Sequence, residues 1–90
     1  MQESLVLSDV SQEDTVREVV RSLSLPKMTG LKVEWAMDYP GQQLAVDLYA
    51  RSDADLAEVV ETVRLALKDR GIESRPSAEI DAEILLLESA

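Results

Sequence analysis

The chain has 90 residues, 46% of them hydrophobic, and carries 18 acidic against 9 basic residues, for a net charge of −9. This length predicts a single domain over residues 1–90, and the charge disfavours nucleic acid and anionic membranes as ligands because Lys and Arg are needed to neutralise phosphates. Cysteine and histidine are absent, so disulfides, thiolate ligands and imidazole bases are excluded. We therefore expect a cytoplasmic protein without membrane spans, since no apolar run approaches the length of a membrane-spanning helix.

A strand over residues 3–10 and a helix over residues 12–24 are the first predicted elements. Leu5 and Leu7 alternate with other residues in the strand. Ser11 is the predicted helix N-cap, and acidic residues follow it, where they favour the positive end of the helix dipole. A stripe at helical spacing forms the predicted inner face: Val16, Val19, Val20 and Leu23. Pro26 ends this helix.

Residues 31–51 form the strongest pattern, a β-hairpin with its turn at residues 39–42. Apolar residues occupy odd positions before the turn and even positions after it, and Pro40-Gly41 suits a tight turn. A two-residue turn would place Glu34 opposite Asp47 and turn Trp35 toward the core. The hairpin then has one apolar face and one polar face.

A second helix is predicted over residues 53–70, with Ser52 as its N-cap and Gly71 just after its end. Its inner face consists of Leu56, Val59, Val60, Val63 and Leu67. Leu65 lies on the opposite side of the helix, either as an isolated exposed leucine or as a dimer contact. Leu25 and Met28, in the preceding connection, either cap the core or form a docking loop.

The last segment, residues 72–90, fits two structures. Apolar and acidic residues alternate from Ala78 to Leu86, which favours a strand, whereas the Ala, Glu and Leu content favours a helix. Pro76 separates the segment from the second helix. We favour the strand because it would complete the sheet.

Together these elements predict an α+β, ferredoxin-like βαββαβ sandwich. Its four-stranded antiparallel sheet would carry both helices on one face, with the first and third strands at its centre. The other face would be open and acidic, without the exposed aromatic and basic residues typical of an RNA-binding sheet.

The carboxylates on this open face could act as a solvated surface, as a docking surface or as a site for chemistry. A catalytic pair needs environments that separate the two pKa values, and a calcium site needs a wrapping loop of the DxDxDG type. Neither pattern is present, so we expect no catalytic residue, no metal and no cofactor. The candidate partner-binding residues are Glu34, Asp47, Tyr49, Leu65, Glu79, Asp81, Glu83, Leu85 and Leu87.

The sequence thus favours a small, non-enzymatic interaction or regulatory domain that binds a protein partner or itself, including as a homodimer. Docking would use the open sheet face and a C-terminal edge strand, where Ile84-Leu-Leu-Leu87 is the strongest signal. Two alternatives stay open: an acidic mimic that occupies the groove of a nucleic-acid-binding protein, and a dimeric domain that senses a small ligand.

Overall fold

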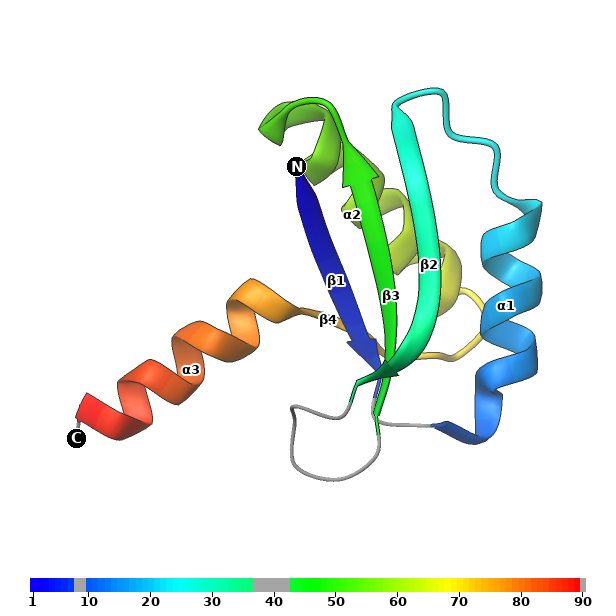
Figure 1. Cartoon of the computed structure of the whole chain (residues 1–90). Coiled ribbons are helices and arrows are strands. Elements are labelled where there is room, and N and C mark those ends of the chain that lie inside the picture. Colours follow the sequence, from blue (N-terminus) through cyan, green and yellow to red (C-terminus); the bar gives the residue numbers. More distant parts are fainter. Residues whose placement is uncertain (8–9, 37–42, 90) are drawn as a thin grey trace.

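The computed structural model describes residues 1–7, 10–36 and 43–89, and the chain forms an α+β fold (Figure 1). Within these residues it has four strands, three α-helices and a short 3-10 helix. The strands are β1 (Gln2–Leu7), β2 (Met28–Ala36), β3 (Gln43–Ala50) and β4 (Arg75–Pro76). The helices are η1 (Val10–Gln12), α1 (Glu13–Ser22), α2 (Asp53–Lys68) and α3 (Ser77–Ser89).

One four-stranded antiparallel sheet organises the fold, in the order β2-β3-β1-β4. The predicted central positions of the first and third strands are confirmed. Helices α1 and α2 share one core with the sheet, whereas α3 projects from the β4 side, away from α1 (Figure 1). The prediction of two helices is wrong, because the segment after β4 adds a third.

The core lies between the sheet and the two packed helices. Its fully buried side chains are Leu5, Leu7, Leu44, Leu48, Leu67, Val16, Val46 and Val63. Leu25 and Met28 pack against this cluster, which confirms that they cap the core. Burying these aliphatic side chains supplies the main driving force for folding, since aromatic residues are only 3% of the chain.

The helix ends follow the predicted chemistry at α2 but not at α1. The Ser52 hydroxyl accepts a 3.2 Å hydrogen bond from the Asp55 backbone N–H, and Gly71 ends the helix with a φ of 77°. At α1 the N-cap is Gln12 without a side-chain cap, because η1 places Ser11 one position too early. Ser11 as N-cap is therefore a wrong prediction.

The hairpin strands are confirmed, but the predicted register is wrong by two residues. Lys32, and not Glu34, lies opposite Asp47, and Glu34 lies opposite Ala45. The predicted turn at residues 39–42 lies outside the described residues. The described strands end at Ala36 and Gln43, which lie opposite each other. A shift of two keeps every side chain on its predicted face.

The C-terminal edge strand is also corrected. β4 covers only Arg75–Pro76, which pair with Val6 and Leu5 of β1, and the chain then enters α3. Helix-forming Ala, Glu and Leu dominate residues 77–89, and their propensity prevails over the alternation that favours a strand. Leu85 and Leu87 therefore lie on a helix and not on a sheet edge.

Candidate docking surfaces

The most exposed apolar surface of the described residues is the C-terminal half of α3. Leu85, Leu86 and Leu87 have exposed fractions of 63%, 72% and 77%, and Ile84 is exposed to a smaller extent. Four consecutive helical residues, 100° apart, cover the whole circumference of the helix. A helix that is apolar on all sides is normally buried, so this turn is a candidate docking element. We call residues 84–87 the apolar turn.

The first half of α3 is acidic and held by one arginine. The Arg75 guanidinium lies 3.1 Å from a Glu79 carboxylate oxygen and 2.6 Å from one of Glu83. Residues 77–89 contain no Lys or Arg, so Asp81 and Glu88 have no basic residue within the helix. The apolar turn is therefore flanked by negative charge.

The open sheet face carries the second candidate cluster: Ser4, Lys32, Glu34 and Asp47. The Lys32 ammonium lies 2.8 Å from a Glu34 carboxylate oxygen, and the Ser4 hydroxyl donates a hydrogen bond to Asp47. Asp47 is only 4% exposed, although it was predicted to lie on a solvated face. Its neighbours on β1 and β2 bury it, because β3 is a central strand.

Burial raises the pKa of Asp47; the Ser4 hydrogen bond acts in the opposite direction, and the neighbouring Glu34 raises this pKa further. The pKa of Glu34 is lowered, first by its hydrogen bond from Lys32 and then by one from Asp47. The two carboxyl groups can share a hydrogen bond only when one is protonated, and Asp47, whose pKa is raised while that of Glu34 is lowered, takes up a proton first as the pH falls.

We expect Asp47→Asn to stabilise the fold at pH 7 by about 1 kcal/mol, because the amide keeps the Ser4 contact without burying a charge. A carboxyl with a raised folded pKa contributes stability at low pH that is lost as pH rises through that pKa. The gain should therefore shrink as pH falls toward the ordinary Asp range. Urea unfolding from pH 3 to pH 8 measures this, with exposed Asp81→Asn as the control. A gain that does not change with pH would contradict the assignment.

The structure separates the remaining predicted site residues. Tyr49 packs over Gly30, where an added Cβ would lie 3.2 Å from the Tyr49 ring, so this tyrosine supports the sheet and is only partly exposed. Leu65 is 46% exposed on α2, as predicted. On the predicted edge strand Leu86 would face the core, whereas on α3 it is exposed. The run of four apolar residues indicates this exposure only when the segment is taken as a helix.

Across the described ranges, no group of three or more acidic side chains is arranged to hold a metal ion. In the same ranges, no helix is long and apolar enough to cross a membrane.

Comparison with known protein families, with curated proteins and with solved structures gave no match.

Proposed function

We propose that the chain is a ferredoxin-like, non-enzymatic interaction domain of the cytoplasm, and that α3 docks into an apolar groove of a partner protein. The sheet order β2-β3-β1-β4 supports the ferredoxin-like part, with α3 as an addition after a short last strand. A composition without cysteine supports the compartment. The observation that carries the proposal is the exposure of the whole circumference of the apolar turn.

The shape of the apolar turn indicates what kind of surface would bind it. A flat partner covers only one side of a helix, and would leave leucine side chains in water. A groove between two helices, or between a helix and a sheet, covers most of the circumference at once. Helix-in-groove docking is therefore the recognition mode that fits α3 best.

The charge of α3 indicates the rim of that groove. Arg75 partly neutralises Glu79 and Glu83, while Asp81 and Glu88 add negative charge without a basic residue in the helix. Two α3 helices would therefore repel each other, and a rim of Lys or Arg would attract either. We commit to a partner other than a second copy of α3.

The contacts of the carboxyl pair Glu34 and Asp47 support the proposal that the domain is not an enzyme. Glu34 and Asp47 are the carboxyl pair with oppositely shifted pKa values, and such a pair could in principle divide acid and base roles. Here Lys32 holds one carboxyl and Ser4 holds the other, so both are engaged within the fold. We assign this cluster a structural role.

The test places a photo-crosslinking amino acid at position 86 in cells that make the protein, identifies the captured protein and measures its affinity in purified form. We expect Leu86→Glu to weaken binding at least about 100-fold, as for a central apolar anchor. Leu65→Glu makes the same chemical change on exposed α2 and should alter affinity less than about threefold.

Added salt should also weaken binding, and Glu88→Lys should remove part of that salt dependence. Equal affinity of the wild type and Leu86→Glu would overturn the proposal. So would crosslinks that form only between copies of this chain.

A further inference from the structure

The edge strand β2 lies on the side of the sheet opposite to β4 and α3. In the order β2-β3-β1-β4, only one side of β2 is paired among the described residues, over a strand of nine residues. An unpaired edge accepts another strand. We propose that β2 pairs antiparallel with β2 of a second copy of this chain, about a two-fold axis at Val33, and joins the two sheets in a homodimer.

The charges on β2 fix this register. With the axis at Val33, Lys32 lies opposite Glu34 of the second copy, and the pairing occurs twice by symmetry. Moving the axis to Lys32 would bring two lysines together, and moving it to Glu34 would bring two glutamates together. Opposite charges facing across strands stabilise a pair and like charges destabilise it, so the charges of β2 favour the axis at Val33 over the two neighbouring positions.

The apolar side of β2 fits the same register. Leu31 then lies opposite Trp35 of the second copy, and Val33 lies opposite its own copy. Trp35 is 42% exposed although it shares the face of the core residues, while Leu31 and Val33 are only partly buried. Pairing at Val33 gives each of these side chains an apolar neighbour.

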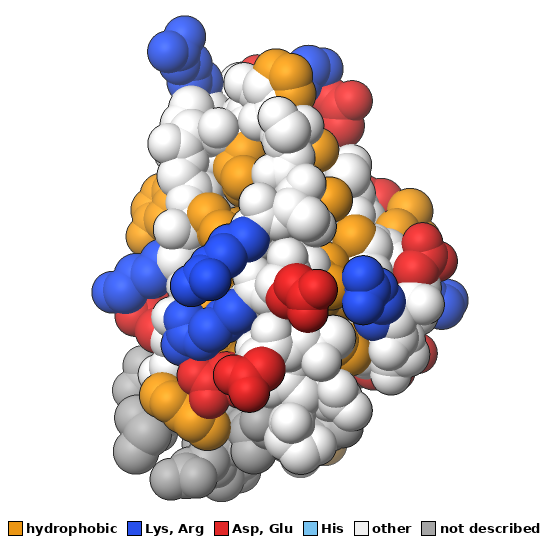
Figure 2. Space-filling view, turned by 90° about the vertical axis from the view of Figure 1, so that its right-hand side faces the viewer, with side chains coloured by type: hydrophobic (Ala, Val, Ile, Leu, Met, Phe, Trp, Pro, Cys, Tyr) orange, Lys and Arg blue, Asp and Glu red, His pale blue; other side chains and the backbone are white. Residues whose placement is uncertain are grey.

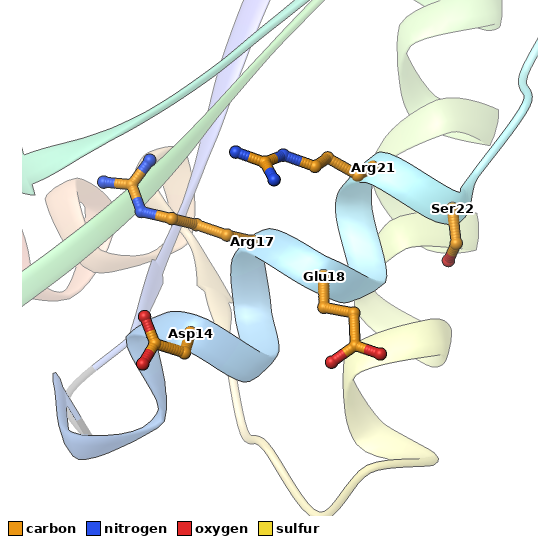
Figure 3. A pocket seen from close by; sticks show the side chains of 5 residues that line it. All are labelled: Asp14, Arg17, Glu18, Arg21 and Ser22. Carbon is orange, nitrogen blue, oxygen red and sulfur yellow. The ribbon is translucent and has the colours of Figure 1, made fainter.

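Helix α1 offers a second self-complementary surface on this side of the molecule. Figure 2, which faces that side, shows acidic and basic side chains intermixed around exposed hydrophobic atoms. Figure 3 shows a hollow along α1, with the guanidinium groups of Arg17 and Arg21 extending to the same side of the helix. The lining residues are Asp14, Arg17, Glu18, Arg21 and Ser22.

From Asp14 to Arg21, the charged residues that line this hollow alternate between acidic and basic. The proposed two-fold axis sets α1 antiparallel to its copy, so each acidic residue can face a basic residue of the second copy. If the axis also passes between Arg17 and Glu18, Asp14 lies opposite Arg21 of the second copy, and Arg17, which is 2.8 Å from Glu13 of its own helix, lies opposite Glu18 of the second copy. The charge pattern on α1 is thus compatible with the two-fold symmetry that the charges on β2 favour.

Net charge opposes any self-association of a chain with a charge of −9. At physiological salt this long-range repulsion is screened beyond about 8 Å, whereas pairs in contact across β2 are screened much less. The dimer would also place its two α3 helices at opposite ends, where both stay accessible.

The test measures the mass of the whole chain by light scattering and sedimentation over a range of concentrations. We expect a dimer for the wild type, and at least tenfold weaker association for Lys32→Glu and for Glu34→Lys, since each replaces two attractive pairs by two repulsive ones. Mixing these two variants should restore association, because every facing pair is then of opposite charge. The double variant K32E/E34K should associate as the wild type does.

Controls separate this register from general charge effects and from misfolding. Lys68→Glu and Glu73→Lys make the same charge changes at exposed positions away from β2 and should leave the dimer intact. Circular dichroism checks the fold of each variant, and the single Trp35 should shift its emission to shorter wavelength on association. A monomeric wild type, variants that associate normally, or a mixture that stays monomeric would each overturn the proposal. A dimer that Leu86→Glu dissociates would do so too.

Discussion

Leu48→Ala should destabilise the fold by about 3 kcal/mol, the middle of the range for truncating a buried leucine. Leu48 is fully buried on the central strand β3, with Leu31 of β2 and Glu3 of β1 as its strand neighbours. The surrounding strands are held in register on both sides, so the cavity cannot readily collapse. For a chain of this size, such a loss lowers the melting temperature by about 12–24 °C, measurable by calorimetry or circular dichroism.

Leu65→Ala is the matched control, because it makes the same chemical change at an exposed position of α2. Here little apolar area is lost, and alanine is at least as good a helix former, so we expect a change below about 0.5 kcal/mol. An equal loss of unfolding free energy in Leu48→Ala and Leu65→Ala would contradict the placement of Leu48 in the core.

The faces of the hairpin were predictable from sequence, whereas its register was not. Alternation has a period of two, so Val33 and Val46 face the core under any even shift of the pairing. The register depended on the assumption that Pro40-Gly41 sits in a two-residue turn. The pairing of Lys32 with Asp47 gives the actual register, in which Glu34 lies diagonally to Asp47, still in contact with it, and not directly opposite.

The burial of Asp47 depends on contacts far apart in sequence. From the hairpin alone it belongs to the polar face, and the structure confirms this, since Ser4 and Lys32 lie opposite Asp47 on the neighbouring strands. Its low exposure comes from β1, which pairs with β3 and brings Ser4 opposite Asp47. No local pattern contains this information, because Ser4 and Asp47 are 43 residues apart.

The C-terminal segment was ambiguous because its alternation and its helix propensity compete. Residues 78–86 match a strand by spacing and a helix by composition, and in the structure β4 ends at Pro76 and the helix propensity prevails. This choice between strand and helix decides whether the apolar turn is exposed. On a strand, Leu86 would face the core beside Ile84, whereas on α3 it is among the most exposed residues of the described chain.

Arg75→Glu should unfold most of α3 while the core stays folded. A helix of 13 residues is marginal in water without tertiary contacts, and the exposed apolar turn provides few. The substitution removes the ion pairs with Glu79 and Glu83 and replaces them by repulsion, and no basic residue in the last turn compensates the helix dipole. Because α1 and α2 contain 10 and 16 residues, the helical signal at 222 nm should fall by about a third.

Arg64→Glu provides the control, since Arg64 forms a comparable ion pair with Glu61 on α2, at 2.5 Å. That helix is packed on the core through Val59, Val60 and Val63, so losing one surface pair should leave its helicity intact. Hydrogen exchange should show fast amides in residues 80–88 of Arg75→Glu and unchanged protection in β1 and β3. If Arg75→Glu kept its full helical signal, α3 would be stable without Arg75. The partner would then bind an α3 that is already folded, so no entropy of ordering would be lost on binding and the affinity would not be reduced by it.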